Sequence, residues 1–449
     1  MGGSSAGGVS VGGIGGASGA VSMGGNGAQG GGPAYLLYGA PLSFAPTATG
    51  FGLNVVLAAG APADLRARVR TEDDEEAWSE LFVPDVVAFD VAEWLIEDLD
   101  AGTEYEYQVL EAGSNSPLYA GRVVTQRPPG EAFGFAVVTD THIAPRTVAA
   151  GDLSTVDFQE QTLFAVADNL GADAPDFIVN LGDMLDFHMF GFNVPPPDAS
   201  WTRLGYLNYR RLFRDTLGAA PHFAVIGNWD GESGCDTEEE IERSRSQRLI
   251  YVPGPVPSTY PEGGSDLEDY YAFTWGDALF VVLNVMTYTE TCHLLGTYPG
   301  VADDWTLGEA QLAWLEETLE NATSKWRFVL IHHAVGGAAG DDINAAYGRG
   351  GGQAARVGEQ AIVHDLMLEH DVRIFFYGHD HVFTDIVVDG IHYTLPGSAG
   401  APWKFTTAET GYTQYWPDSG HGRVWVSESA VEVEFVSVEG EILYEFAVQ

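Results

Sequence analysis

The sequence has 449 residues, which is enough for two or three domains that each bury a core. Hydrophobic residues make up 45% of it, as in globular proteins, but no apolar run approaches the roughly 18 residues that span a bilayer. The formal net charge is -44, and the only lysines are Lys325 and Lys404. A chain this acidic repels nucleic acids and anionic membranes, so we expect no nucleic-acid binding. The lack of a long apolar run predicts no transmembrane segment.

Residues 1–33 differ in composition from the rest of the chain. The first 32 residues include 15 glycines, and most of the others are Ser, Ala and Val. Such a segment buries too little surface to fold and behaves as a flexible tether. It resembles the tether of an exported bacterial lipoprotein, which implies an extracellular or cell-envelope protein with a lipid or surface attachment. The other interpretation is a disordered leader without a role.

Residues 34–127 show the pattern of a separate β domain. Short runs rich in β-branched and aromatic residues alternate with Gly, Pro and Asp turns, as in a β-sandwich. The stretch Leu99–Tyr107 is similar to the late-strand signature of fibronectin type III domains, in which a Tyr anchors the corner. Pro128-Pro129-Gly130 is the expected linker to the next domain.

Residues 131–449 alternate between strand-like and helix-like runs, which predicts an α/β (α+β) domain. We expect helices over 159–170, 307–322 and 358–371 and a surface helix over 238–251. A hairpin is expected over 270–288, with its turn at Gly276-Asp277. Residues 423–448 read as a β-meander that completes the second sheet of this domain.

Five short polar segments each follow an apolar, strand-like run in this domain, so their side chains are expected at strand ends. Asp, Asn and His together form a mixed oxygen and nitrogen ligand set, which suits Zn, Mn or Fe. Such a set can hold two ions about 3.5–4 Å apart and activate a bridging water. The five segments are Asp140-Thr141-His142, Gly182-Asp183, Gly227-Asn228-Trp229-Asp230, His332-His333 and Gly378-His379-Asp380-His381.

The order of these segments resembles the calcineurin-like metallophosphoesterase family over roughly Phe133 to Gly397. The resemblance implies a four-layer α/β/β/α sandwich. The small β domain ahead of it resembles the one that precedes the catalytic domain of purple acid phosphatases. The implied ligands are Asp140, His142 and His381 for the first metal, Asn228, His332 and His379 for the second, and Asp183 as the bridge.

The implied activity is hydrolysis of phosphate mono- or diesters of small molecules by a metal-bridging hydroxide. Two divalent or mixed-valence ions of Fe, Mn or Zn are the implied cofactors. The candidate catalytic residues are Asp140, Asp183, Asn228 and His333. Because a strand alternates its faces, only one of His332 and His333 is expected to point at the metals; His333 either faces the substrate or lies behind the ligands.

Trp229 departs from the family pattern, in which a His at this position is thought to protonate the leaving group or stabilise phosphoryl oxygens. Indole donates a hydrogen bond but carries no titratable proton, so Trp229 can bind substrate without acting as a general acid. The enzyme then favours good leaving groups, recruits another imidazole or is a poor catalyst. The candidates for recruitment are His188, His222 and His333.

A second departure separates the chain from the purple acid phosphatases. These enzymes carry a metal-bound Tyr three residues after the bridging Asp, whereas this sequence has Asp186 there. Position 142 is also His instead of Gly. The first metal site therefore resembles the non-purple branch, with Asp186 as either an extra ligand or a loop cap.

Other candidate contacts with substrate are less specific. Arg349 lies in a Gly-rich loop that could bind a phosphate group; the alternative is a plain flexible turn. Trp201, Tyr206, Tyr209 and Trp403 could stack on a base or aryl group, although core packing is the commoner use of such residues. Cys235 and Cys292 fit either one disulfide or two inert thiols.

Two rival functions remain at this point. One is a cell-surface binding module that keeps the fold with weak activity or none. The other is a metal-dependent hydrolase that acts on a non-phosphate bond.

Overall fold

The computed structural model describes residues 37–58, 64–71, 78–143, 153–186, 199–234, 237–289, 306–335 and 358–449. The predicted tether lies outside these residues. So do His188, Cys235, Cys292 and Arg349, so the disulfide and the phosphate-binding loop stay predictions.

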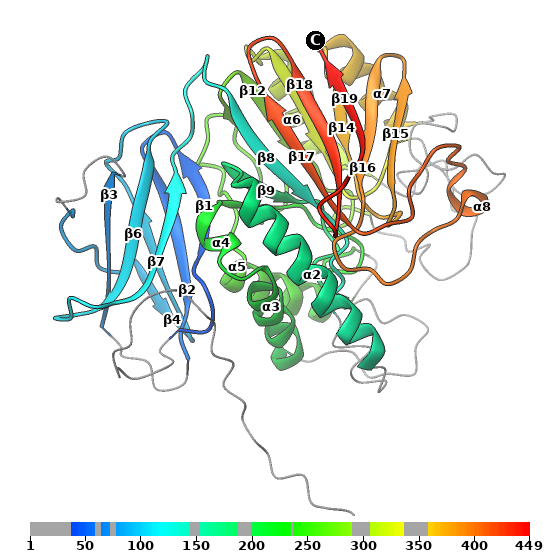
Figure 1. Ribbon diagram of the computed structural model, residues 1–449. Helices are drawn as coiled ribbons and strands as arrows, with labels where there is room; N and C mark the ends of the chain where they lie inside the picture. The colour runs from blue at the N-terminus through cyan, green and yellow to red at the C-terminus, as the bar shows by residue number, and fades with distance from the viewer. Residues whose placement is uncertain are drawn as a thin grey trace, which may run out of the picture. The chain divides into compact units, whose positions relative to one another are not determined.

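The first part of the described chain is all β (Figure 1). Its two layers are the strands β1-β2-β5-β4 and the separate sheet β3-β6-β7, and they enclose a common core that includes Trp94 and Tyr107. The hydroxyl of Tyr105 accepts a hydrogen bond of 2.9 Å from the Asp100 amide, as expected of a corner tyrosine. The strands are β1 (Leu42–Thr47), β2 (Gly50–Val56), β3 (Leu65–Thr71), β4 (Val86–Ala88), β5 (Val91–Ile96), β6 (Glu104–Glu111) and β7 (Pro117–Val124).

This β region is continuous with the rest of the fold through one sheet. Strand β1 pairs in parallel with β10, where Phe44 faces His222, so the large sheet has the order β19-β18-β17-β8-β9-β10-β1-β2-β5-β4. The fibronectin-like assignment and the boundary at residue 127 stay predictions. The additional strands are β8 (Phe133–Val138), β9 (Phe177–Asn180), β10 (His222–Ala224), β17 (Gly420–Val426), β18 (Val431–Ser437) and β19 (Ile442–Val448).

A second sheet of six strands has the order β11-β12-β13-β14-β16-β15. Its strands β12, β13, β14 and β16 run parallel, and the hairpin β11–β12 closes at Gly276-Asp277 as predicted. The strands are β11 (Tyr271–Trp275), β12 (Ala278–Val282), β13 (Trp326–Leu330), β14 (Ile374–Phe376), β15 (Phe383–Val388) and β16 (Ile391–Pro396).

The helices cover the outer faces of the two sheets. In β8, Ala136 and Val138 face a core shared with α2 and α3, whereas Phe135 faces the other sheet. In β13, Phe328 faces the first sheet and Val329 faces a core shared with α6 and α7. The helices are α2 (Leu153–Asp173), α3 (Ala199–Phe213), α4 (Thr216–Ala219), α5 (Glu238–Tyr251), α6 (Gly308–Glu320), α7 (Glu359–Glu369) and α8 (Thr407–Thr410).

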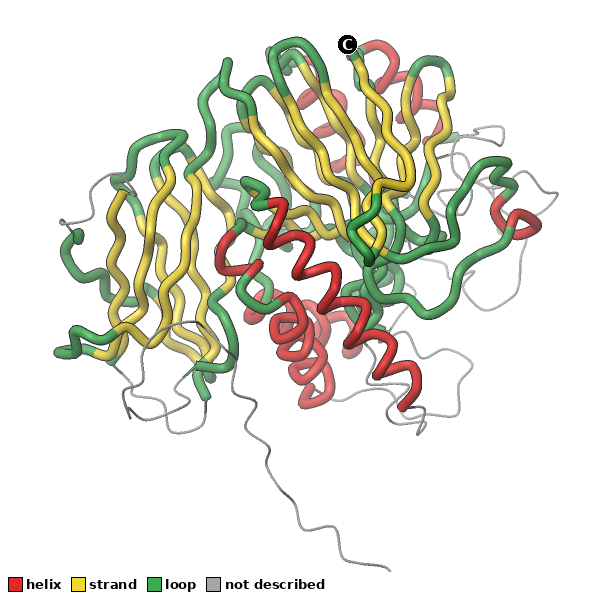
Figure 2. Tube along the Cα trace, viewed as in Figure 1, coloured by secondary structure: helices red, strands yellow, loops and turns green. Residues whose placement is uncertain are grey.

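These cores give the predicted α/β/β/α layering, because alternate residues of each central strand face opposite layers. Figure 2 shows helices in front of the strands that include β8 and β9. The parallel strands of both sheets therefore end in loops along neighbouring edges, which is where ligands bind in such folds.

The predicted helices and the hairpin are confirmed, but two details were wrong. The meander β17–β19 pairs through β17 with β8, so it extends the first sheet and not the second. Helix α5 is not wholly a surface helix, because the buried Arg248 pairs with the buried Glu232 across 2.5 Å.

Candidate metal centre

The five polar segments follow five strands of the two sheets. Asp140 and His142 follow β8, Asp183 follows β9, and Asn228 follows β10. From the second sheet, His332 and His333 follow β13, and His379 and His381 follow β14. All of these side chains are buried, and they meet as two groups of potential metal ligands.

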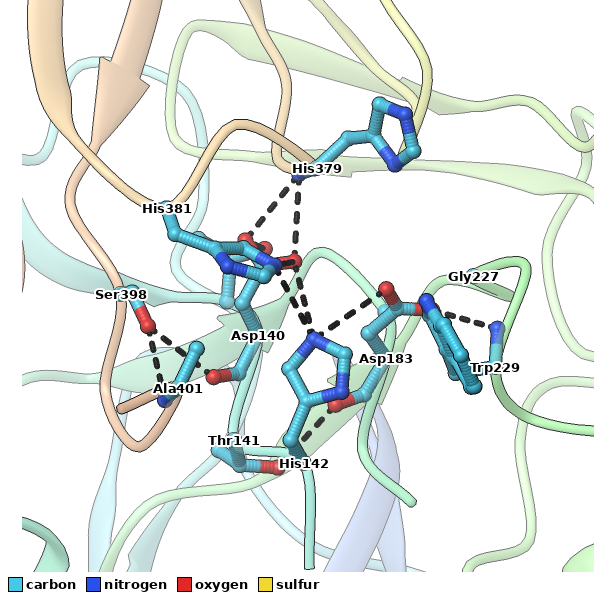
Figure 3. A network of polar contacts seen from close by, with 12 residues as sticks. Asp140, Thr141, His142, Asp183, Gly227, Trp229, His379, His381, Ser398 and Ala401 are labelled. Atoms are coloured by element: carbon cyan, nitrogen blue, oxygen red, sulfur yellow. Dashed lines mark hydrogen bonds and ion pairs between the residues drawn. The ribbon is translucent and has the colours of Figure 1, made fainter. Parts of the chain in front are cut away.

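The first group consists of Asp140, His142, Asp183 and His381, whose ligand atoms all lie within 4.8 Å of one another. His142 Nε2 lies 3.1 Å from His381 Nε2, 3.8 Å from Asp140 Oδ1 and 3.4 Å from Asp183 Oδ2 (Figure 3). His381 Nε2 lies 3.3 Å from Asp140 Oδ1. Two imidazole nitrogens and two carboxylates thus converge on one small volume.

The second group consists of His332, His333 and His379. The rings of His333 and His379 stack with centroids 3.9 Å apart, and His332 Nε2 lies 3.1 Å from Asn228 Oδ1. Both histidines of the pair 332–333 have a ring nitrogen among these potential ligand atoms, and the expectation that only one of them points at the metals stays a prediction. The strand β13 ends at Leu330, so its alternation of faces no longer applies at 332 and 333.

Asp183 of the first group also reaches the second group. Its Oδ2 atom is 3.4 Å from His142 Nε2 in the first group and 3.1 Å from His332 Nε2 in the second. Among the described residues, no donor has hydrogen-bond geometry to this buried oxygen. A buried carboxylate oxygen without a hydrogen bond is costly unless a cation binds it, so this atom fits a metal ligand.

The backbone of the centre is strained. Five of its residues have left-handed φ values, which are unusual outside glycine: Asp140 (53°), His142 (46°), Asp183 (52°), His379 (75°) and His381 (57°). Such strain persists only where the surrounding structure holds it, and it gathers at functional sites. Glycine is needed close by, because a Cβ atom at Gly227 would collide with the Asp183 carboxylate.

Hydrogen bonds to atoms that would not bind a metal fix the orientation of the ligand side chains. His332 Nδ1 lies 2.8 Å from the Leu181 carbonyl, and His381 Nδ1 lies 3.0 Å from the Trp403 carbonyl. In each ring, a bond from Nδ1–H to a carbonyl leaves Nε2 as the nitrogen that can bind a metal. The Asp140 carboxylate accepts bonds from the Thr139 hydroxyl at 2.8 Å and from the backbone amide of His379.

Asp230 anchors the loops that carry Asp183 and Asn228. Its Oδ2 accepts the amides of Asp183 (3.0 Å) and Gly227 (2.9 Å), and its Oδ1 accepts the amide of Leu185 (3.0 Å). In the sequence, Asp230 is recognisable only as the last residue of the motif Gly227-Asn228-Trp229-Asp230. Its role depends on three backbone amides from two separate loops, which no sequence pattern places together.

The electrostatics of the centre favour bound cations. Burial raises the pKa of the Asp140 carboxyl, but the adjacent His381 and His142 outweigh burial and hold that pKa well below its usual range. Burial lowers the pKa of His332, but the Asp183 carboxylate outweighs it and raises that pKa to about 9. Burial lowers the pKa of His381 to about 4, although Asp140 acts in the opposite direction. An anionic Asp140 and a neutral His381 are the protonation states that metal ligation requires, whereas His332 holds a proton in the metal-free protein that a metal ion would displace.

The aromatic residues predicted to contact substrate differ in where they lie. Trp229 and Trp403 lie beside His142, with ring centroids 6.0 and 5.0 Å away. Tyr206 and Tyr209 are instead buried in the core around α3, so they cannot stack on substrate.

His222 begins β10, whereas Asn228 follows the end of this strand. His222 Nε2 lies 2.6 Å from the Tyr209 hydroxyl, and burial lowers the His222 pKa to about 3. Both facts argue against His222 as the recruited proton donor. Asp186 is buried, and its charge helps to raise the pKa of His142, so it lies near the first group without being part of it.

A sequence model of calcineurin-like phosphoesterases matches residues 133–383, more than half of the chain. The chain belongs to this family. The match covers all five polar segments, which confirms the family predicted from their order and spacing. No curated protein sequence matches the chain significantly.

Solved structures agree on the fold. The structure of PhoD matches with a TM-score of 0.70 and 14% identity over 93% of this chain and 92% of that chain. A purple acid phosphatase, PPD1 from yellow lupin (Lupinus luteus) seeds, matches with a TM-score of 0.62 and 13% identity over 92% of this chain and 74% of that chain. At such low identity these similarities establish a metallophosphoesterase fold and leave substrate open.

Within the described segments, no helix is both long and apolar enough to cross a membrane.

Proposed function

We propose that the protein hydrolyses phosphate esters of small molecules with two divalent or mixed-valence metal ions. Asp140, His142 and His381 would hold the first ion. Asn228, His332 and His379 would hold the second, and Asp183 would bridge the pair. His333 stacks on His379 and stands close enough to contact either an ion or the substrate.

The position of Asp183 carries this proposal. One carboxylate oxygen lies within 3.4 Å of an imidazole nitrogen on each side, so it can bind two ions at once. A protein with a single structural metal has no need of this arrangement. The two ligand groups also differ in composition, since the first contains two carboxylates and the second contains only imidazoles.

When bound, two such ions supply an activated water and neutralise charge on the phosphoryl group. The protein's own residues orient these components. Carbonyl oxygens fix the rings of His332 and His381, and Asp230 fixes the backbone of Asp183. The Trp229 amide donates 2.7 Å to Asp183 Oδ1, which leaves Oδ2 for the ions.

No proton donor occupies the position that the family usually fills with His. The Trp229 indole N–H can donate a hydrogen bond to a phosphoryl oxygen, but it cannot protonate a departing alkoxide. The proposed enzyme therefore acts best on esters whose leaving group departs without a proton.

Hydrolysis of 4-nitrophenyl phosphate and bis(4-nitrophenyl) phosphate by protein loaded with Mn, Zn or Fe tests the proposal. Asn228→Ala should lower kcat/KM at least about 100-fold, beyond the 10–100-fold typical of residues that only orient a ligand. The exposed Asn321→Ala, at the end of α6, is the matched control and should leave the rate unchanged.

Full metal loading without hydrolysis of either ester would favour the binding-module alternative instead. Equal values of kcat/KM for Asn228→Ala and the parent would refute the role of Asn228 as a metal ligand.

A further inference from the structure

Three aromatic side chains gather around the first ligand group. The Trp229 ring lies 6.0 Å from the ring of His142, and the Trp403 ring lies 5.0 Å from His142 and 5.4 Å from His381. The Phe405 ring lies 5.1 Å from His381. We call Trp229, Trp403 and Phe405 the aromatic wall.

The rings of the aromatic wall pack on ligand imidazoles and lie outside the hydrophobic cores of the described residues. Within the described part of the chain, its three residues are only partly buried, and none belongs to the four hydrophobic cores. Other tryptophans, such as Trp94 and Trp275, are fully buried in those cores. Partly exposed aromatic residues that gather at a polar centre are candidates for contact with a ligand.

Backbone hydrogen bonds tie this wall to the candidate metal ligands. The Trp229 amide donates to Asp183 Oδ1, and the Trp403 carbonyl lies 3.0 Å from His381 Nδ1. The segments that carry them come from different sheets, after β10 and after β16. Two rings from separate elements are therefore held beside the same ligand group, where they can contact a planar group bound there.

We infer that the aromatic wall binds an aromatic ring in the alcohol part of the phosphate ester. This inference rests on the proposed function and specifies its substrate class. Ring–ring contacts add affinity beyond burial alone, and offset or edge-to-face arrangements at 4.5–7 Å are the favoured ones. The absence of an imidazole at position 229 agrees with this class, because a phenolate leaves without protonation more readily than an alkoxide.

Non-hydrolysable phosphonates separate ring binding from leaving-group chemistry. Phenylphosphonate and cyclohexylphosphonate are close in size, but only the first is aromatic, and an acyclic adenine phosphonate represents nucleotides. Their binding to the metal-loaded full chain is measured by calorimetry. We expect the phenyl compound to bind about 10-fold more tightly than the cyclohexyl one.

The variants Trp403→Leu and Phe405→Leu should each reduce this ratio to about 3 or less while metal content stays the same. Trp425→Leu is the matched control, since Trp425 is exposed on β17 opposite Gly134 at the start of β8, away from the ligand-bearing strand ends. Trp403→Phe keeps a ring and should retain most of the preference, which guards against misreading a folding defect. Tighter binding of the adenine phosphonate than the phenyl one would identify the ring as a nucleobase.

Equal binding of the phenyl and cyclohexyl compounds overturns the inference and leaves the proposed function intact. The same holds if the ratio is unchanged in both leucine variants. If the parent binds no metal, cleaves no ester and binds no phosphonate, the proposed function fails and the inference fails with it.

Discussion

Asp230→Asn removes one oxygen acceptor and a negative charge while it keeps the shape of the side chain. The native carboxylate accepts three backbone amides, from Asp183, Leu185 and Gly227, in a fully buried position. An asparagine oxygen can keep the two bonds at Oδ2. Its NH2 group then faces the Leu185 amide, so two donors meet and one buried N–H loses its partner.

The expected loss of stability in Asp230→Asn follows from these hydrogen bonds. An unsatisfied buried amide costs about 1–3 kcal/mol, and two charge-assisted bonds that become neutral lose about 1 kcal/mol each. Burial and the charge of Asp183 raise the pKa of Asp230 to about 7, so its negative charge is itself costly in the metal-free protein and its removal offsets the weaker bonds. We therefore expect Asp230→Asn to lower the free energy of unfolding of the metal-free protein by about 1–3 kcal/mol, the cost of the unsatisfied Leu185 amide. The Asp183 amide then donates to a neutral oxygen and the nearby Leu185 amide loses its acceptor, so the strained backbone of Asp183 is held less firmly and metal affinity should also fall about 10–100-fold.

The assay is urea unfolding of the metal-free protein, followed by a metal titration of the folded variant. Asp371→Asn, at an exposed carboxylate, is the control and should change the free energy of unfolding by less than about 0.5 kcal/mol. A loss below about 1 kcal/mol in Asp230→Asn, with metal affinity unchanged, would refute the role assigned to Asp230.

Three further predictions concern catalysis, acid stability and colour. Trp229→His should raise turnover of alkyl phosphates by about 10- to 100-fold and flatten the dependence of rate on leaving-group pKa; an unaltered dependence means that another group donates the proton. Burial raises the pKa of Asp173, but hydrogen bonds from His421 (2.8 Å) and Arg423 (2.6 Å) outweigh it and hold that pKa below its usual range. The ionised Asp173 thus stabilises the fold above the ordinary carboxyl pKa of about 3.9, and this stabilisation is lost as the pH falls below that value. The unfolding midpoints of the parent and of Asp173→Asn should therefore converge on acidification from pH 6 to 3. A constant difference between the two midpoints contradicts this. An iron-loaded form should lack a visible tyrosinate band, because Asp186 stands where purple acid phosphatases carry Tyr; a purple solution would show that another Tyr binds the metal.

The sequence could predict which residues form the centre because each follows a buried strand. The run Phe133–Val138 is too apolar for a loop and too short for most helices, and Asp140 comes directly after it. Parallel strands end at the same edge of a sheet, so the order of segments along the chain is enough to place Asp140, Asp183 and Asn228 together.

Other features depend on contacts that no local pattern contains. The meander β17–β19 has the same alternation whether it pairs with β8 or with the second sheet, and only packing decides between them. Trp403 follows β16 with no polar motif around it, yet its carbonyl holds His381. Tyr206 and Tyr209 looked available for substrate because a helix with several aromatic residues does not reveal which of its faces is covered.

Metal stoichiometry of the full chain and of Asp183→Ala tests the central claim most directly. The account predicts about two ions per chain in the parent after loading with Mn, Zn or Fe, and a loss of most of both in Asp183→Ala, because one carboxylate serves the pair. His142→Ala, which removes a ligand of the first ion alone, should lose about one. A parent that binds one ion or fewer, or an Asp183→Ala variant that keeps two, would contradict the dinuclear centre.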